Sequence, residues 1–371
     1  SSDEEQADYI QIQDANKNVI RKENGKYHLK IAIWEIGSGK AGAKVKVLVW
    51  CATAEDCRVF EQYNMGRIEF EYTPDTLTEE NVSSCKGYEG IVIQTRCMIT
   101  EKVAALLAEA GVIFIACRSA GFDHVNLAAI KKYGIKACNV PLYSPNAIAE
   151  YAVMASMMAL RKVKKQLHMT EKGDYTLKGL RGQELRDQTI GIIGTGRIGM
   201  ESLKIFSSFT KDILLYDPYP REDAKAMGIY VSLDEIYEKS TLLVFHCPFT
   251  KENFHMVNGD SIRKMRTGVV LVNPARGGLF DHQAVLEGLK EGKIGALAMD
   301  VYEDEKNYLR KDLKGESTGD AVFDQLISRE DVIYTAHTAF YTDRAIFNMI
   351  ETTVENLWEY GQTGSCAHEL T

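Results

Sequence analysis

From residue 44 onward the sequence alternates short apolar segments with helix-like segments, and this alternation restricts the possible folds more than any other feature. KVKVLVW (44–50), EGIVIQT (89–95) and GVIFIAC (111–117) have the length and the β-branched content of buried strands. Between the last two, TEKVAALLAEAG (100–111) starts with an N-capping threonine and ends in glycine, as helices do. Strand–helix–strand repetition predicts an α/β fold in which helices cover both faces of a parallel sheet.

A long helix separates this block from a second one. In YSPNAIAEYAVMASMMALRKV (143–163), Ser144 is placed to cap the helix and Pro145 suits its first position. The strand-like segments TIGIIG, DILLYD, TLLVFHCP, GVVLVN and IGALAMDVY follow, spaced widely enough for crossover helices. A chain of 371 residues is long for one hydrophobic core. We therefore expect two domains, each a doubly wound parallel sheet of the Rossmann type.

A glycine motif opens the second block. TIGIIGTGRIG contains Gly194, Gly196 and Gly199 in G-x-G-x-x-G spacing, after a strand and before a helix. Asp217 ends the next strand, eighteen residues after Gly199. This context predicts a dinucleotide site, in which glycines let the backbone approach a pyrophosphate at the helix N-terminus. A carboxylate at position 217 would accept hydrogen bonds from ribose hydroxyls and repel a 2′-phosphate, which favours NAD over NADP, although Arg221 lies close by in the sequence.

Charged residues follow two later strands. Arg276 comes directly after VVLVN, where a doubly wound sheet binds ligands, and its planar guanidinium suits a carboxylate. Asp300 and Glu305 belong to an acidic run, ALAMDVYEDE, which by itself is equally compatible with a solvated loop. His337 lies in YTAHTAFYTD and is one of only eight histidines. Since histidine titrates near neutrality, it is a candidate for proton transfer.

Composition excludes several classes of partner. The net charge of −8 argues against nucleic acid and anionic membranes. No apolar run approaches the ~20 residues of a membrane-spanning helix. The eight cysteines form no C-x-x-C pair, so we expect reduced, mostly buried thiols and neither a metal site nor disulfides. The polar start SSDEEQAD does not look like a secretory leader, which favours a cytoplasmic protein, with an organelle reached after loss of a targeting peptide as the alternative.

Residues 1–43 do not follow the alternating pattern. YIQIQ and KYHLKIAIWEI suggest two strands around the turn DANKN, and GSGKAGA suggests a flexible linker. We treat this stretch as an N-terminal extension of unknown role.

Taken together, IIGTGRIG, VNPARGGLFD, AMDVYEDE and TAHTAFYT, in this order and spacing, resemble the NAD-dependent D-isomer-specific 2-hydroxyacid dehydrogenases. NVPLYSPNAIAEYAV and HTAFYT resemble in particular the D-lactate dehydrogenase branch. The resemblance covers about residues 44–371, and departs from the family's usual pattern where Ala336 replaces a proline before the histidine. It implies an oxidoreductase that reversibly reduces a 2-keto acid to a D-2-hydroxy acid with NADH.

The resemblance also implies a catalytic trio of Arg276, Glu305 and His337. His337 would exchange the proton, Glu305 would stabilise its imidazolium form, and Arg276 would bind the substrate carboxylate and polarise the keto group.

Further positions follow from the same resemblance. The other substrate-binding residues would be Ala120 and Gly121 through their backbone N–H groups, Tyr143 through its hydroxyl, Phe340 as an apolar wall, and Gln94 and Arg96 as candidates for the side-chain pocket, which are equally compatible with solvent exposure. The cofactor contacts would be Gly194, Gly196, Arg197, Ile198, Gly199, Asp217, Cys247, Pro248, Asn253, Pro274, Ala275, Arg276 and Asp300, the last beside the nicotinamide carboxamide.

The resemblance implies a discontinuous arrangement as well. Residues 44–143 and 338–371 would form the substrate-binding domain, and 144–337 an inserted NAD-binding domain through which two copies form a homodimer. Two alternatives stay open: another reaction of the superfamily, such as formate or phosphite oxidation, and an NAD(H)-sensing binding protein similar to corepressors. Glu305 argues against the formate type, and the lack of a long tail or an obvious nuclear signal argues against the corepressor type.

Overall fold

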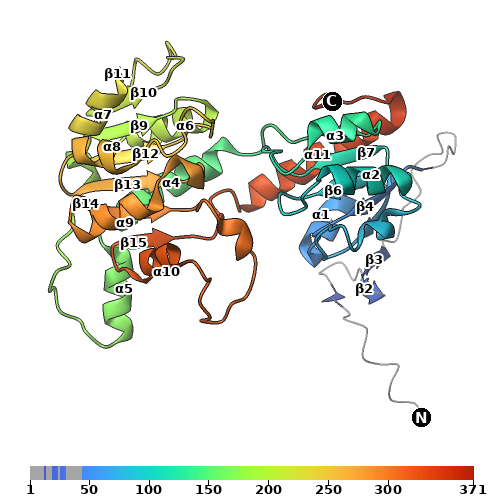
Figure 1. Ribbon diagram of the computed structural model, residues 1–371, viewed down its shortest axis with the longest axis horizontal. Helices are drawn as coiled ribbons and strands as arrows, with labels where there is room; N and C mark the ends of the chain where they lie inside the picture. Colours follow the sequence, from blue (N-terminus) through green and yellow to red (C-terminus); the bar gives the residue numbers. More distant parts are fainter. Residues whose placement is uncertain (1–11, 14–18, 24–25, 31–43) are drawn as a thin grey trace. The chain divides into compact units, whose positions relative to one another are not determined.

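The computed structural model describes residues 12–13, 19–23, 26–30 and 44–371, and these divide into two compact units. Unit 1 comprises the described residues up to Tyr143 together with Asp343–Thr371, and unit 2 is Ser144–Thr342 (Figure 1). The chain therefore passes into unit 2 once and returns once. The sequence analysis placed the first crossing at the same position and the return at residue 338.

Unit 1 is built on a sheet whose strand order is β1-β2-β3-β5-β4-β6-β7-β8. Its parallel strands are β4 (Lys46–Val49), β5 (Glu69–Tyr72), β6 (Gly90–Ile93), β7 (Phe114–Cys117) and β8 (Lys136–Cys138). Its helices are α1 (Ala54–Asn64), α2 (Glu101–Glu109), α3 (Leu127–Lys132) and α11 (Asp343–Thr363), with a 3-10 turn at Val82–Cys85. The C-terminal helix α11 thus belongs to the same unit as the N-terminal part of the chain.

Part of the N-terminal extension joins this sheet. β1 (Ile12–Gln13), β2 (Val19–Glu23) and β3 (Lys26–Lys30) pair antiparallel with one another, and β3 pairs antiparallel with β5. The sequence analysis expected two strands here and missed β2, because VIRKE is short and has only two apolar residues. The predicted turn at 14–18 and the predicted linker at 37–43 lie outside the described residues.

Unit 2 is a second sheet, entirely parallel, with the order β11-β10-β9-β12-β13-β14-β15. The strands are β9 (Ile190–Ile193), β10 (Ile213–Tyr216), β11 (Ile229–Tyr230), β12 (Leu242–Phe245), β13 (Val269–Asn273), β14 (Ile294–Met299) and β15 (Val332–Tyr334). The order reverses between β9 and β12, and ligands of doubly wound sheets bind at the carboxyl ends of the strands beside such a reversal.

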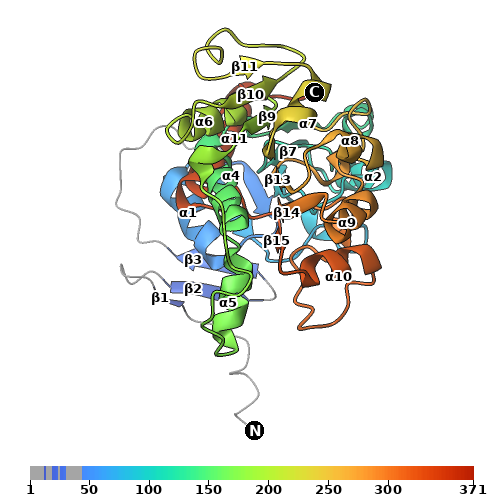
Figure 2. The same cartoon turned by 90° about the vertical axis from the view of Figure 1, so that its left-hand side faces the viewer.

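Helices cover both faces of this sheet (Figure 2). The helices are α4 (Pro145–Leu160), α5 (Val163–Glu171), α6 (Arg197–Phe206), α7 (Leu233–Lys239), α8 (Gly259–Lys264), α9 (His282–Lys290) and α10 (Ala321–Ser328). Short 3-10 turns lie at Leu185–Asp187, Gly277–Leu279 and Glu305–Asn307. One apolar core packs α4 and α6 on the sheet, and a separate core packs α7 to α10 on the opposite face. The predicted two-domain α/β fold is confirmed.

Helix α4 illustrates how local sequence sets this architecture. Its Ser144 hydroxyl accepts a hydrogen bond from the N–H of Ala147, and Pro145 occupies the first helical position, both as predicted. Alanines at its buried positions allow close approach, and α4 packs extensively against α6. Although α4 is apolar on most sides, no helix within the described residues is long and apolar enough to cross a membrane.

The cysteines are free thiols, of which six are buried and two are partly exposed. One of these thiols, that of Cys51, lies near a basic side chain. The Sγ of Cys51 lies 3.5 Å from that of Cys97. A hydrogen bond from Cys97, and then the charge of Arg96, lower the pKa of Cys51 to about 6 although burial opposes the shift. In the described part of the chain, no group of three or more His, Cys, Asp or Glu is arranged to hold a metal ion.

A buried ion pair stabilises the loop that follows β7. Arg118 donates from Nη1 to Oδ1 of Asp56 at 2.7 Å, and the two side chains are only 5% and 9% exposed. The Asp56 carboxylate also accepts the N–H of Thr53 and so closes the capping box of α1. Burial by itself would raise the pKa of Asp56, but the charge and hydrogen bonds of Arg118 hold it below its ordinary value.

We predict that Asp56→Asn lowers the free energy of unfolding by roughly 3–5 kcal/mol at pH 7, since it leaves a buried guanidinium without its counter-charge. A depressed carboxyl pKa adds stability that is present above the unfolded-state value and is lost as the pH falls below it. The variant should therefore lose less stability than wild type below about pH 4. Urea unfolding followed by circular dichroism measures both effects. Glu101→Gln, which breaks the exposed pair with Lys132, is the control and should leave the free energy of unfolding nearly unchanged.

Candidate active site

The glycine motif forms a tight turn between β9 and α6. Gly194 has a φ of 97°, and a Cβ there would lie 2.5 Å from the backbone nitrogen of Cys247. A Cβ on Gly199 would lie 2.0 Å from the carbonyl oxygen of Gly194. In contrast, a Cβ on Gly196 would meet nothing within 4 Å, so the space in front of the helix N-terminus is open. The turn is therefore closely packed at Gly194 and Gly199 and open at Gly196, as a pyrophosphate-binding turn requires.

Asp217 follows β10 and faces this turn. Its Oδ2 accepts hydrogen bonds from the N–H of Thr195 at 2.7 Å and from the Thr195 hydroxyl at 3.2 Å. Its Oδ1 accepts the N–H of Tyr219. The guanidinium of Arg221 is paired with Asp223, with nitrogen–oxygen distances of 2.6 and 2.9 Å. The carboxylate is thus fixed beside the glycine turn, and the charge of Arg221 is neutralised by another acid.

The other predicted cofactor residues follow neighbouring strands. Arg197 and Ile198 occupy the first turn of α6, while Cys247 and Pro248 follow β12. Asn253 holds the loop after β12 by donating to the carbonyl oxygen of Pro248 and accepting the N–H of Thr250.

After β13, the segment Pro274–Arg276 is held by Asn273. The Asn273 side chain accepts the N–H of Ala275 and donates to the carbonyl oxygen of Arg276. The predicted cofactor residues of unit 2 therefore gather along the carboxyl edge of a single sheet.

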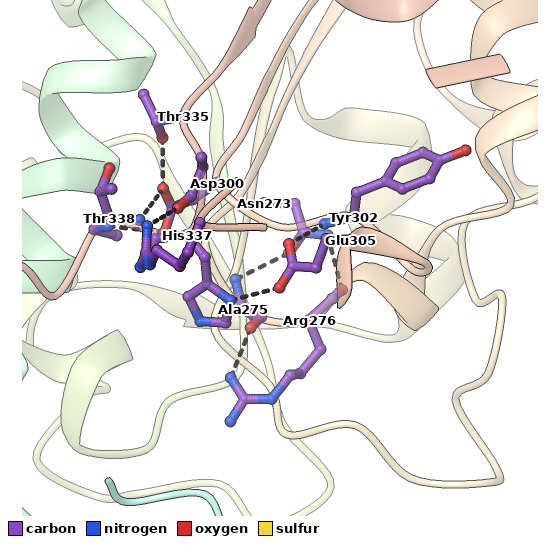
Figure 3. A network of polar contacts seen from close by, with 12 residues as sticks. Asn273, Ala275, Arg276, Asp300, Tyr302, Glu305, Thr335, His337 and Thr338 are labelled. Carbon is purple, nitrogen blue, oxygen red and sulfur yellow. Dashed lines mark hydrogen bonds and ion pairs between the residues drawn. The ribbon is translucent and has the colours of Figure 1, made fainter. Parts of the chain in front are cut away.

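The predicted acid and histidine are in direct contact. Oε1 of Glu305 lies 2.6 Å from Nδ1 of His337, and its Oε2 accepts the N–H of Tyr302 at 2.9 Å (Figure 3). Because an ionised carboxylate only accepts hydrogen bonds, Nδ1 carries a hydrogen and Nε2 is left for a ligand. The His337 side chain is 34% exposed and that of Glu305 only 14%. The pair is accessible from the imidazole side.

Arg276 lies at the end of the neighbouring strand β13, and Figure 3 shows it with this pair. Its side chain is exposed and donates from Nη1 to the carbonyl oxygen of Ala275 at 2.8 Å. Behind it, Gly277 fits against the loop that carries Glu305: a Cβ there would lie 2.2 Å from the carbonyl carbon of Tyr302. The close approach of these two backbones brings the arginine-bearing and the acid-bearing loops together.

Asp300 anchors the turn that presents His337. Its side chain is buried, and its carboxylate accepts hydrogen bonds from Thr338 N and Ala339 N, each at 2.8 Å, and from the Thr335 hydroxyl at 2.5 Å. Burial raises the pKa of Asp300, and these donors oppose that shift. The contact of Asp300 with the cofactor stays a prediction, and within the structure its oxygens hold the backbone of the histidine turn.

The predicted substrate residues of unit 1 lie in loops after its strands. Ala120 and Gly121 follow β7, where their carbonyl oxygens accept hydrogen bonds from Asn139 and Ser119. Within the part of the chain that the structure describes, neither of their backbone N–H groups donates to a protein acceptor. Tyr143 is the last residue of this part of unit 1, and its carbonyl oxygen accepts a hydrogen bond from Asn348.

Gln94 and Arg96 follow β6. Gln94 donates to the carbonyl oxygen of Cys51, just beyond β4, so this loop lies where the strand order of unit 1 reverses. Arg96 is exposed. In unit 2, Phe340 packs edge-on to the His337 ring, with 6.4 Å between centroids.

Several residues that shape the site were not predicted from the sequence. Thr335 bonds to Asp300 and to the hydroxyl of Tyr151 on α4, and Arg310 donates to two carbonyl oxygens of the histidine turn. Thr335 could have been suspected, because it lies two residues before His337. Nothing in the sequence around Arg310 distinguishes it from other exposed cations.

Known proteins resemble this chain over most of its length. Residues 153–339 match the sequence model of the "D-isomer specific 2-hydroxyacid dehydrogenase, NAD binding domain". An "Aromatic 2-oxoacid reductase" of Clostridium sporogenes is 36% identical over 88% of this chain and 99% of its own. A "D-lactate dehydrogenase" of Escherichia coli is 36% identical over 88% of this chain and 100% of its own. The chain belongs to the D-isomer-specific 2-hydroxyacid dehydrogenases.

Solved structures of the family have the same fold. The D-lactate dehydrogenase TP0037 of Treponema pallidum has a TM-score of 0.79 at 35% identity, covering 88% of this chain and 100% of that one. The NAD-complexed enzyme of Lactobacillus delbrueckii has a TM-score of 0.75 at 25% identity, with the same coverage. This chain is thus an NAD-dependent dehydrogenase of the family, and its cradle at Gly194–Gly199 fits that cofactor.

Proposed function

We propose that this enzyme reversibly reduces a 2-keto acid to a D-2-hydroxy acid with NADH, using His337 as the acid–base group. The observation that supports this most directly is the contact between His337 Nδ1 and Glu305 Oε1 at 2.6 Å. The names of the relatives, an aromatic 2-oxoacid reductase and D-lactate dehydrogenases, support the substrate class.

The proton is handled by the histidine pair. Bound NADH supplies the hydride that reaches C2 of the keto acid. His337 holds a proton at Nε2 for the keto oxygen, on which negative charge develops during reduction. Glu305 holds the ring by Nδ1 and stabilises the imidazolium, and it is itself oriented by the N–H of Tyr302.

The substrate carboxylate is bound by cations and amides. In this proposal Arg276 attracts it with a planar guanidinium and polarises the keto group. In unit 1, we also assign to substrate binding the backbone N–H groups of Ala120 and Gly121, which donate to no protein acceptor within the described residues. We assign Tyr143 a hydrogen bond to the substrate and Phe340 an apolar wall beside His337.

Cofactor binding uses the carboxyl edge of the unit 2 sheet. We assign the pyrophosphate to Gly196, Arg197 and Ile198, where the helix N-terminus is open. Asp217 would accept the ribose hydroxyls, and Cys247, Pro248 and Asn253 would line the adenosine side. Pro274, Ala275 and Asp300 would lie toward the nicotinamide.

The decisive experiment is a turnover assay that follows NADH loss with a panel of 2-keto acids: pyruvate, phenylpyruvate, oxaloacetate and 2-oxoglutarate. Turnover of at least one, with a D-configured product, is expected. Binding of NADH without turnover of any of them would instead support the corepressor-like alternative, and formate or phosphite oxidation is tested in the same assay run with NAD.

We predict that His337→Gln lowers kcat in both directions by about 10²- to 10⁴-fold while NADH still binds, because the proton donor is lost. Reduction needs the protonated imidazole and oxidation the neutral one, so the two wild-type pH profiles should bend in opposite directions. Glu305→Gln should also lower kcat, because the imidazole loses the carboxylate that holds Nδ1. Stopped-flow rates and NADH fluorescence titration measure these effects, and near-normal turnover of His337→Gln would refute the assignment.

The preference for NADH depends on one carboxylate. We predict that Asp217→Ala weakens NADH binding and narrows the preference over NADPH, because Asp217 no longer accepts the ribose hydroxyls or repels a 2′-phosphate. Glu222→Ala, which removes an exposed acid paired with Lys225, is the control and should leave both Kd values unchanged. A wild-type enzyme that uses NADPH as well as NADH would contradict the role of Asp217.

For the side-chain pocket we propose Gln94 and Arg96. Arg96 is exposed just after β6. A guanidinium next to an aliphatic tail is unfavourable, whereas a second carboxylate on the substrate would accept its hydrogen bonds. We predict higher kcat/KM for oxaloacetate or 2-oxoglutarate than for pyruvate, and loss of that preference in Arg96→Ala. Lys102→Ala, an exposed cation on α2, is the control. Equal kcat/KM values, unchanged by Arg96→Ala, would exclude Arg96 from substrate selection.

We also propose that two copies associate through the NAD-binding unit. Large apolar side chains are exposed on α4, on α5 and on the segment after it: Met154, Leu167, Tyr175 and Leu177, the last 87% exposed. Contiguous apolar patches mark interaction surfaces, and we propose that these side chains contribute to one. The molar mass of the full-length protein in solution tests this proposal, and twice the mass of one chain is the expected result. The cytoplasmic location stays a prediction.

A further inference from the structure

His337 has an unusual backbone conformation. Its φ is 53°, in the left-handed region that L-residues with a side chain rarely adopt. Such a conformation persists only where surrounding contacts determine it, and it sets the direction in which the side chain leaves the backbone. The contacts that hold this one residue in the left-handed region therefore also determine where the imidazole points.

Two groups hold this turn from opposite sides. On the amide side, His337 N–H donates to the carbonyl oxygen of Asp300 at 2.7 Å. On the carbonyl side, Arg310 donates from Nη1 to the oxygen of Ala336 at 2.6 Å and from Nη2 to the oxygen of His337 at 2.7 Å. A guanidinium presents its two nitrogens in a fixed plane, so it fixes both the separation and the direction of these consecutive carbonyl groups.

The loop that carries Arg310 also carries Glu305. The carbonyl oxygen of Glu305 accepts the N–H of Leu309 at 2.7 Å, which links the two ends of this short segment. Between them, Tyr308 is buried and stacks on Phe323 with 4.5 Å between ring centroids. One anchored loop thus contacts the histidine twice, at its imidazole through Glu305 and at its backbone through Arg310.

We propose that Arg310 is a positioning residue for catalysis: its guanidinium fixes the left-handed turn at His337 and thereby directs Nε2 toward the substrate. This inference rests on the proposed role of His337 as the proton donor. Arg310 itself does not touch substrate or cofactor in this proposal. It acts only through the histidine, so its removal should have no effect on catalysis once the imidazole is gone.

The test is a double-mutant cycle with the full-length chain. Arg310→Met removes the guanidinium and keeps an unbranched apolar stem. In the wild-type background we expect kcat for keto-acid reduction to fall about 10- to 100-fold, the scale of a misplacement near 1 Å. KM for the keto acid and Kd for NADH should stay within about 2-fold. In the His337→Gln background the same substitution should change the residual kcat by less than about 2-fold, since coupled positions are not additive.

Two further variants separate geometry from charge. Arg310→Lys keeps the charge but has a single ammonium, so we expect it to recover only part of kcat. Lys311→Met is the matched control: it removes a neighbouring exposed cation whose Nζ donates to the carbonyl oxygen of Asn307, and it should leave kcat within about 2-fold of wild type. Thermal unfolding confirms that each variant is folded at the assay temperature.

The outcomes are distinct. An Arg310→Met enzyme with kcat within about 2-fold of wild type overturns the proposal, as does an equal loss in the His337→Gln background, which would place Arg310 outside the action of the histidine. A matching loss in Lys311→Met would attribute the effect to general disturbance of the loop and also overturn it. Near-normal turnover of the single variant His337→Gln would contradict the proposed role of His337 itself. This result does not depend on any substitution at Arg310, so the two failures can be told apart.

Discussion

The site depends above all on one buried carboxylate, that of Asp300. It is 1% exposed, and its burial is compensated by hydrogen bonds from a hydroxyl and from consecutive backbone amides of the turn after β15. A buried charge without such donors would be strongly destabilising. If the turn around His337 changed conformation, this carboxylate would lose its hydrogen-bond donors or become exposed to solvent. The cost of that change stabilises the left-handed conformation of His337, a non-glycine residue.

From that anchor the remaining contacts form a connected sequence. Thr335 joins Asp300 to Tyr151 on α4, so the long helix is linked to the histidine turn. Glu305 holds the imidazole, and Gly277 lets the loop of Arg276 lie against the loop of Glu305. Arg276 and Gly277 follow β13, Asp300 and Glu305 follow β14, and Thr335 and His337 follow β15. Parallel strands bring their carboxyl ends to one edge of the sheet. The topology brings these groups together, and the hydrogen bonds fix their orientation.

Much of this was predictable from sequence, and the reasons are specific. The strands of unit 2 are continuous apolar runs bounded by turn residues. In the motif at Gly194–Gly199, the first and last positions require glycine because a Cβ there would collide with the backbone. Ser144 and Pro145 mark the start of α4 because capping is local. Features of this kind depend on residues a few positions apart, and a pattern read along the chain contains them.

The contacts that were not predicted join distant positions. Arg118 and Asp56 lie 62 residues apart in sequence, and their pairing depends on how β7 is placed beside the start of α1. Arg310 meets the turn at His337 only because a loop without any recognisable motif folds back on itself around Tyr308. Strand β2 was missed for a different reason: its pairing with two short neighbours compensates for weak β-propensity.

The net charge of the chain does not show how charges are distributed near the site. The chain carries a net charge of −8, which by itself would repel a keto acid and a dinucleotide, both anions. Near the site the cations differ in how they are neutralised. Arg221 is paired with Asp223, and Arg310 is engaged by carbonyl oxygens. Arg276 lies exposed at a strand end, and within the described residues its side chain makes one hydrogen bond, to a carbonyl oxygen. A cation attracts an incoming anion as long as no carboxylate neutralises its charge. An acidic protein can therefore still bind acidic ligands where such cations are exposed.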